Sequence, residues 1–122
     1  MTNAEQFNYE FLESIPEHLQ ERVLYISTTY ATVVHLCACG CRREVVTPLS
    51  PTDWELTFHG DTVSLSPSVG NWNLSCRSHY WIRRGRVRWA GWMSPEEIAI
   101  GRAQSRRRKQ LYARMRRPAP EQ

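Results

Sequence analysis

Four cysteines in this chain are spaced as metal ligands are. Cys37, Cys39 and Cys41 lie within five residues, and Cys76 begins the segment Cys76-Arg-Ser-His79. All cysteines of the 122-residue chain belong to these two segments. Thiolates are soft ligands, and four cysteines, or three with one histidine, form the usual tetrahedral zinc site. We therefore expect the two segments to come together around a zinc ion.

The ligand set of this predicted site stays open. The simplest set uses all four cysteines, a second set replaces one of them with His79, and His35 is a further donor close in sequence. A site with four protein ligands has no open position and is structural. A catalytic zinc would keep one position for water and use a nearby carboxylate such as Glu44 as base. We expect the structural form with four cysteines.

A serine and two histidines form a second group that could do chemistry. Ser68 lies in a segment rich in serine, proline and glycine, which predicts a turn with an exposed hydroxyl. The amides of Val69 and Gly70 would then face an oxyanion, and His79, or alternatively His35, would take the serine proton. Such a pair performs acyl transfer or peptide hydrolysis. The structural alternative is a serine that caps its own loop and a histidine that packs or binds metal.

The elements that must position these residues are mostly strands. Runs of β-branched and aromatic residues separated by turn residues predict strands over 22–27, 30–36 and 44–49, then hairpins over 53–65 and 79–90. Residues 1–20 lack this pattern and predict a loose lead-in with one helical turn at 16–20. The fold class we expect is mainly β (α+β): a small antiparallel sheet stapled by a zinc knuckle.

The second predicted hairpin has one apolar face. Tyr80, Ile82, Val87 and Trp89 alternate with polar or mixed residues along its two strands. Alternation with a period of two is typical of a sheet that buries one face. We expect these four side chains to point into the core.

The C-terminal segment has a different character. Ser94-Pro95-Glu96-Glu97 is a capping box, which predicts a basic helix that runs to about Arg116 and stops before Pro118. Residues 94–122 carry eight Lys or Arg and three Glu, whereas 1–93 carry eight Arg and nine acids. We expect a zinc-stapled β domain over 1–93 with this helix appended over 94–117. The charge indicates an acidic partner, nucleic acid or protein, or else a solvated helix face.

Composition excludes several classes of protein. Hydrophobic residues make up 41% of the chain and five are tryptophan, which indicates a globular protein and not a disordered one. No apolar run approaches the roughly 18 residues of a membrane span. The first ten residues are polar, unlike a signal peptide. We therefore expect a cytoplasmic protein without membrane contact, in which cysteines stay reduced and available to metal.

These segments together resemble a small bacterial family known as a domain of unknown function. The likeness covers roughly residues 15–90, through an H-x-C-x-CGC strand, an L-x-PSI-G turn and a C-x-SHY-x-I strand. The motifs correspond here to His35, Cys37, Cys39 and Cys41, then Pro67, Ser68, Val69 and Gly70, then Cys76, Ser78, His79, Tyr80 and Ile82. The one departure is Val69, where the family usually has isoleucine.

The resemblance implies a function in bacterial protein modification. Genes of this family lie beside those for ubiquitin-like, E1-like and E2-like proteins, in clusters that resemble antiphage defence operons. Members are proposed to be peptidases that trim a ubiquitin-like precursor or remove it from its targets. The resemblance thus implies a peptidase with ubiquitin-like, E1-like and E2-like partners.

Three functions remain open from the sequence. The first is a peptidase, in which Ser68 attacks and Glu44, Asp53 or Asp61 orients the histidine, or in which a zinc-bound water attacks instead. The second is an adaptor that binds ubiquitin-like or E2-like proteins without chemistry. The third is nucleic-acid binding through the basic tail and arginines of the second hairpin, a group comprising Arg83, Arg84, Arg86 and Arg88 interleaved with Trp81 and Trp89. We expect the serine peptidase.

Overall fold

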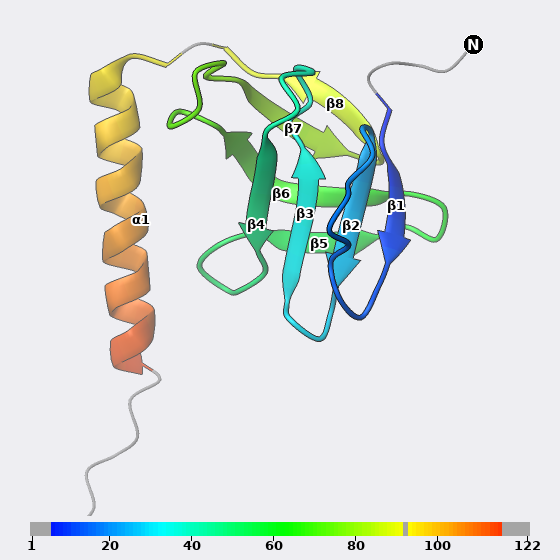
Figure 1. Cartoon of the computed structure of the whole chain (residues 1–122). Helices are drawn as coiled ribbons and strands as arrows, with labels where there is room; N and C mark the ends of the chain where they lie inside the picture. The colour runs from blue at the N-terminus through cyan, green and yellow to red at the C-terminus, as the bar shows by residue number, and fades with distance from the viewer. Residues whose placement is uncertain (1–5, 92, 116–122) are drawn as a thin grey trace, which may run out of the picture. The chain divides into compact units, whose positions relative to one another are not determined.

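The computed structural model describes residues 6–91 and 93–115, which form two small β-sheets and one helix (Figure 1). The first sheet has the order β1 (Asn8–Phe11), β2 (Val23–Ser27), β3 (Thr32–Leu36), β4 (Glu44–Pro48). The second has the order β5 (Glu55–Phe58), β6 (Val63–Gly70), β7 (His79–Arg83), β8 (Arg86–Trp89). Helix α1 (Pro95–Met115) follows.

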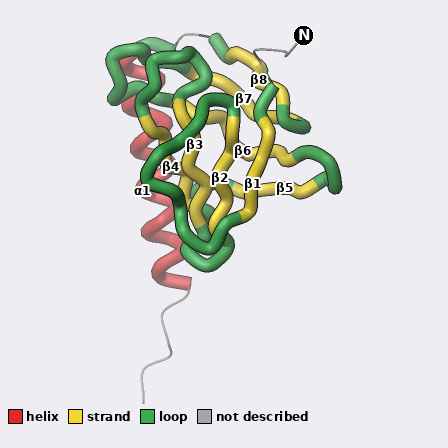
Figure 2. The backbone as a smooth tube through the Cα atoms, turned by 45° about the vertical axis from the view of Figure 1, so that its right-hand side comes forward, coloured by secondary structure: helices red, strands yellow, loops and turns green. Residues whose placement is uncertain are grey.

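The two sheets lie one in front of the other, and their strands cross (Figures 1 and 2). β1 pairs with β2 in parallel, and every other pair of neighbouring strands is antiparallel. The core between the sheets takes alternate side chains of each strand, including Leu24 and Ile26 from β2 and Leu65, Tyr80 and Ile82 from the second sheet. Each of these is at most 1% exposed, and burying a large apolar side chain contributes about 1.5–3 kcal/mol. Burial of these side chains therefore decides which residues of the second sheet point into the core and which point outward.

The predicted mainly β fold with a C-terminal helix is confirmed, and the strands within 22–36, 44–49 and 79–90 are found. One detail of the second hairpin differs. Tyr80, Ile82 and Val87 are buried as expected, but Trp89 is 49% exposed and packs edge-on against the Tyr80 ring, with 5.5 Å between ring centroids. Trp89 ends the last strand, so part of its ring extends past the core.

The prediction for residues 1–20 is wrong in part. Residues 8–11 form β1, and residues 16–20 form a bend instead of a helical turn. β1 is held by pairing in register with β2 and by Phe7, whose ring is buried in the core. These contacts are tertiary, and a strand of four residues carries too short a pattern to be recognised locally.

The turn predicted around Ser68 is also wrong. β6 continues through Gly70, although its register against β7 shifts between Leu65 and Val69. Such an irregularity accommodates Pro67, which cannot donate a ladder hydrogen bond. Val69 is buried beyond it, and this burial holds the segment in the sheet in spite of its turn-forming residues. Ser68 therefore sits on a strand beside the irregularity, a more rigid support than a loop.

The helix begins as its sequence predicts. The Glu97 amide donates to Ser94 Oγ over 3.1 Å, and the Ser94 amide donates to Glu97 Oε1 over 3.3 Å. This reciprocal pair is the capping box, and it satisfies two amides that the first turn cannot. The helix continues to Met115, and the predicted stop at Pro118 lies outside the described residues.

The chain divides into two compact units, Met1–Gly91 and Trp92–Gln122.

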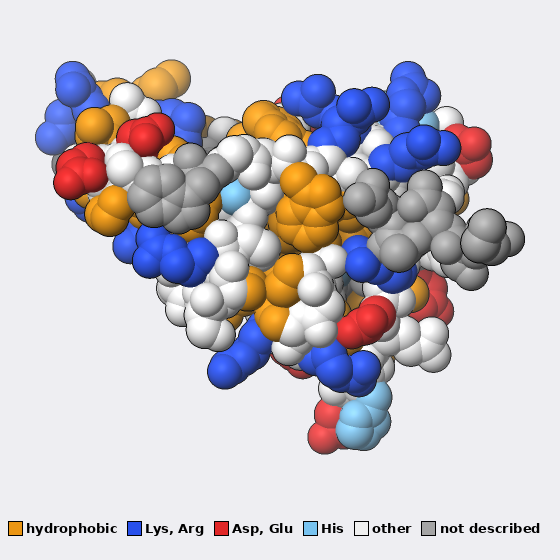
Figure 3. Space-filling model, turned by 90° about the horizontal axis from the view of Figure 1, so that it is seen from above, with side chains coloured by type: hydrophobic (Ala, Val, Ile, Leu, Met, Phe, Trp, Pro, Cys, Tyr) orange, Lys and Arg blue, Asp and Glu red, His pale blue; other side chains and the backbone are white. Residues whose placement is uncertain are grey.

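The chain has sixteen basic and twelve acidic residues, and Figure 3 shows that Lys and Arg gather in groups on the face it presents. In the described part of the chain, no helix has the length and apolar character that a membrane span requires.

Candidate active site and metal centre

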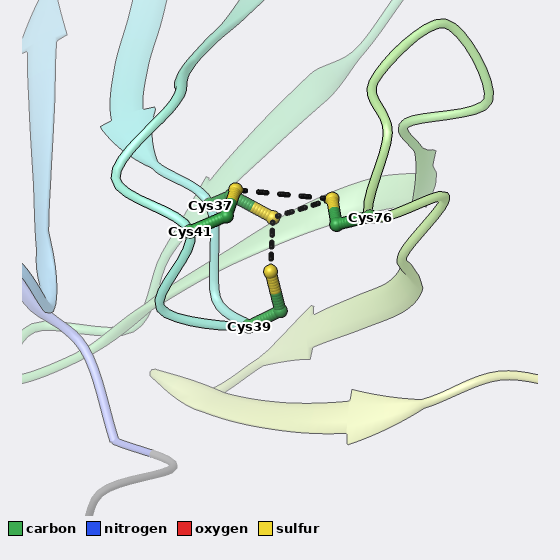
Figure 4. Close-up of side chains that lie close together, drawn as sticks. All are labelled: Cys37, Cys39, Cys41 and Cys76. Atoms are coloured by element: carbon green, nitrogen blue, oxygen red, sulfur yellow. Dashed lines mark hydrogen bonds between the residues drawn. The ribbon is translucent and has the colours of Figure 1, made fainter.

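Two loops bring the four cysteines together (Figure 4). The first loop follows β3, and it folds back because the Cys37 amide bonds to the Arg43 carbonyl over 2.9 Å and the Gly40 amide to the Cys37 carbonyl over 3.1 Å. Gly40 has a φ of +90°, a conformation that glycine adopts without strain. Cys76 enters from the loop between β6 and β7, so the cluster links the two sheets.

The cluster has the dimensions of a tetrahedral thiolate site. All four Sγ atoms lie within 4.8 Å of one another. Separations between Sγ atoms are 3.5 Å for Cys37–Cys39 and 3.8 Å for both Cys37–Cys76 and Cys41–Cys76. A zinc ion at about 2.3 Å from each sulfur requires edges of about 3.8 Å between sulfurs. The residues present therefore fit a zinc ion, and the four cysteines supply all the ligands it needs.

Polar neighbours hold the most buried of these thiols. Cys37 Sγ lies 2.9 Å from Ser78 Oγ, and the Asn71 side-chain amide donates to Cys37 Sγ over 3.6 Å and to Ser78 Oγ over 3.0 Å. Burial raises the pKa of the Cys37 thiol, so a bound cation is what would make it a thiolate. Asn71 has no role in the sequence predictions, because an asparagine in a turn-rich stretch carries no recognisable metal signal.

The two histidines considered as ligands point elsewhere. His35 lies in the core, where its Nε2 is 2.7 Å from the Tyr80 hydroxyl and its ring meets Phe7 edge-on. Burial lowers the pKa of His35 to about 3, so it stays neutral near pH 7. The hydrogen bonds of His79 also point away from the sulfurs, toward Ser68 and Gly91. The geometry thus favours the four-cysteine ligand set over the set with His79.

The structure brings Ser68 and His79 together. Ser68 Oγ lies 2.8 Å from His79 Nε2, and His79 Nδ1 lies 3.3 Å from the carbonyl oxygen of Gly91. A carbonyl only accepts, so Nδ1 carries the hydrogen and Nε2 is left as an acceptor for the serine hydroxyl. This is the tautomer that a general base needs. His35, the other candidate base, is hydrogen-bonded to Tyr80 instead.

A glycine and a tryptophan position the imidazole. Gly70 pairs with His79 across β6 and β7, and the Trp72 ring packs against the His79 ring with 5.0 Å between centroids. A Cβ on Gly70 would lie 2.6 Å from Trp72 Nε1, closer than side-chain carbons approach. The absence of a side chain at Gly70 therefore lets Trp72 cover the strand and support His79. No sequence pattern indicates a role in catalysis for this tryptophan, since its contact with His79 depends on the strand register.

The group that orients His79 is a backbone carbonyl. Glu44, Asp53 and Asp61 were the acids considered for this role, but among the described residues Nδ1 of His79 bonds to Gly91. Asp53 accepts a hydrogen bond from Ser50 Oγ over 2.7 Å. A carbonyl fixes the tautomer as a carboxylate does, though it stabilises the imidazolium less because it has no full charge.

The pairing of β6 with β7 sends the two predicted oxyanion amides, those of Val69 and Gly70, in opposite directions. The Asn71 amide donates to the Ser78 carbonyl over 2.8 Å, which sets the phase of the β6–β7 ladder. Antiparallel pairing alternates, so the Val69 amide points at β7 and the Gly70 amide points away from it. A pocket of about 350 Å³ opens along this side of β6, lined by Val69, Gly70 and Asn71 and, across from them, by Glu44, Val45, Val46, Trp54, Asn73 and Leu74.

Comparison with known proteins agrees with this geometry. Residues 11–90 match the family model described as bacterial ubiquitination-like system serine protease (BubE). Neither the curated proteins nor the solved structures contain a match to the chain. The match covers both sheets from the end of β1, all four cysteines, Ser68 and His79. It confirms the expected serine-type enzyme and its place in a ubiquitin-like system: the chain belongs to the BubE family of serine proteases.

Proposed function

We propose that Ser68 and His79 are the catalytic pair of this protease and that its substrate is a ubiquitin-like protein. The observation that carries the proposal is the 2.8 Å contact between Ser68 Oγ and His79 Nε2, with Nδ1 held by the Gly91 carbonyl. In a family of serine proteases, a serine hydroxyl bonded to an oriented imidazole is the expected nucleophile and base. The reaction would trim a precursor tail or release the protein from its targets.

The chemistry follows from the geometry of the pair. His79 Nε2 takes the proton as Ser68 Oγ attacks the scissile carbonyl carbon, and the carbonyl oxygen becomes an oxyanion near the Gly70 amide. His79 then gives the proton to the leaving nitrogen as the C–N bond breaks, which leaves an acyl ester on Ser68. Water, deprotonated by His79, attacks this ester, and the proton returns to Ser68 as the new carboxylate departs.

The pocket beside Gly70 suits an extended substrate. It lies between β4, an edge strand of the first sheet, and the part of β6 beyond the end of its pairing with β5. Unpaired strand edges offer backbone groups that an extended chain can bind by adding a strand. The C-terminal tail of a ubiquitin-like protein must be extended when it is cleaved, and a tail in this pocket would pass Gly70, two residues from Ser68, although neither Ser68 nor His79 lines the pocket itself.

The metal in this proposal is structural zinc. Cys37, Cys39, Cys41 and Cys76 would hold it, and four thiolates leave no open position for a reacting water. When bound, zinc would tie the loop after β3 to the loop before β7 and so fix the start of the strand that carries His79. The reduced thiols that it requires support a cytoplasmic location, which we include in the proposal.

The test is cleavage of the cognate ubiquitin-like protein, carrying its native C-terminal extension or joined to a target lysine, read by intact mass. Ser68→Ala and His79→Ala are expected to abolish the shortened product while metal analysis still finds one zinc per chain. Ser64→Ala is the matched control, since Ser64 also lies on β6 and also bonds to a histidine. Cleavage that survives Ser68→Ala, or that Ser64→Ala abolishes, would contradict the proposal.

A further inference from the structure

Four arginines and a histidine line a second pocket on the outer side of the second sheet. The pocket is shallow, about 520 Å³, and is lined by His59, Ser64, Arg83, Arg84, Arg86 and Arg88. All four arginines are exposed. None of these four arginines forms an ion pair with a carboxylate of the described residues, so the positive charge of the group is not paired there. We call the group the arginine pocket.

The arginine pocket shares a face of the sheet with Ser68 and His79. Tyr80 and Ile82 of β7 point into the core, so His79, Trp81 and Arg83 point outward from the same strand. On β8, Arg86 and Arg88 pair with Arg83 and Trp81 and face the same way.

The spacing between the two sites is set by one strand. His79 and Arg83 are four residues apart on β7, which corresponds to about 13 Å. Trp81 lies between them, and the Arg83 guanidinium stacks on its ring, 4.6 Å from the centroid. An extended substrate laid over this face would cross Trp81 and reach the arginine pocket about four residues from its scissile bond.

From this arrangement we propose that the arginine pocket is a specificity subsite that binds an acidic side chain, or two neighbouring ones, of the protein substrate. The inference rests on the catalytic role proposed for Ser68 and His79. Arg83 and Arg86 stand side by side with like charges, an arrangement that an anion relieves. Guanidinium groups bind carboxylates through charge-assisted, bidentate hydrogen bonds. The shared face with the serine favours a protein substrate over nucleic acid, because only the protein substrate must also reach Ser68.

The test uses fluorescent peptides that span the processing junction of the cognate ubiquitin-like protein. Each carries Glu at three, four or five residues on either side of the scissile bond, and each has a partner with Gln at the same position. We expect kcat/KM to be about 10-fold higher for one of the Glu peptides, near four residues from the bond. The triple variant Arg83→Gln, Arg86→Gln, Arg88→Gln is expected to lose this advantage, so that it cleaves each Glu peptide and its Gln partner with equal kcat/KM.

A matched control removes the same charge from the other unit of the chain. The variant Arg106→Gln, Arg107→Gln, Arg108→Gln changes three exposed arginines of α1 and is expected to keep the preference for Glu. Unchanged thermal unfolding and zinc content would show that both triple variants are folded. Equal cleavage of Glu and Gln peptides by the wild-type protein would overturn the inference and leave the proposed function intact.

A binding experiment separates this inference from the catalytic proposal. Ser68→Ala protein is titrated with the labelled Glu and Gln peptides and with a short single-stranded DNA, and anisotropy is read. Tighter binding of the Glu peptide, lost in the pocket variant, supports the subsite even if no cleavage is ever seen. Tighter binding of the DNA than of every Glu peptide, lost in the same variant, would overturn it in favour of a nucleic-acid surface.

Discussion

Strand β6 carries two serines that each bond to a histidine at the same distance. Ser68 Oγ lies 2.8 Å from His79 Nε2, and Ser64 Oγ lies 2.8 Å from His59 Nε2. The first pair joins β6 to β7 across eleven residues, and the second joins residues five apart within one hairpin. A short contact between a serine and a histidine is therefore not sufficient to define an active site in this molecule.

The two pairs differ in what surrounds them. The amide of Arg84 donates to Ser64 Oγ over 2.8 Å, which uses a lone pair that a nucleophile needs. The described residues provide no partner for Nδ1 of His59, whereas Nδ1 of His79 bonds to Gly91. The difference teaches that the orientation of the base and the freedom of the serine oxygen, and not the short contact alone, favour Ser68 and His79 as the proposed catalytic pair.

The largest effect is expected when the histidine of each pair is replaced by alanine. His79→Ala is expected to lower kcat for the ubiquitin-like substrate by about 10³-fold, since it removes the general base and acid. His59 lines the arginine pocket but does not contact Ser68, so at saturating substrate His59→Ala should leave kcat within about two-fold of wild type. Steady-state cleavage assays on both variants measure this, and equal losses would remove the distinction between the two pairs.

Loss of the metal is expected to have the second largest effect. It should disturb the Ser68–His79 pair and leave the Ser64–His59 pair unchanged. Cys76→Ser, or treatment with a chelator, is expected to release the zinc and lower cleavage by about 10²-fold, because Cys76 precedes His79 by three residues. Imidazole signals in a proton–nitrogen NMR spectrum should shift for His79 and stay in place for His59. Full activity in a metal-free sample would contradict a structural zinc.

A smaller effect is expected from Gly70→Ala. The new Cβ would meet Trp72 Nε1 at 2.6 Å and displace the ring that supports His79, so kcat should fall by about 10-fold with little change in KM. Gly101→Ala is the control, because a Cβ there meets nothing within 4 Å. If the two variants cleave equally well, Trp72 does not position the base.

The smallest effect concerns stability and His35, the histidine that is buried in the core. The pKa of His35 is lowered by burial to about 3, below its ordinary value of 6.5, so the unfolded chain binds the proton more readily. Its contribution to stability is complete above pH 6.5 and is lost toward pH 3, by at most about 1.4 kcal/mol per pH unit. Urea unfolding of wild type and His35→Gln across this range should give a flatter profile for the variant; parallel profiles would contradict the assignment.

The sequence predicted the parts of this site that depend on residue type. Clustered cysteines indicated a metal centre, and Ser68 and His79, predicted as nucleophile and base, lie in hydrogen-bond contact in the structure. The strands followed from β-branched runs, because a period of two reports which face is buried. The capping box at Ser94 is likewise a local signal.

What the sequence could not predict depends on register and tertiary contact. Ser68 was expected on a turn, but pairing with β7 and burial of Val69 keep it on a strand. The carbonyl of Gly91 that orients His79 has no side chain, so no residue type signals it. Strand β1 is held in place by its pairing with β2, which no local pattern reports. The position of the arginine pocket on the same face as Ser68 likewise depends on the pairing of β7 with β8.

The most direct measurement is to treat the zinc-loaded protein with a fluorophosphonate, which reacts with activated serine hydroxyls, and to locate the adduct by peptide mass mapping. One adduct on Ser68, absent in His79→Ala and present in His59→Ala, is the result expected here. An adduct on Ser64, or labelling of Ser68 that persists without His79, would contradict the claim that Ser68 and His79 are the catalytic pair.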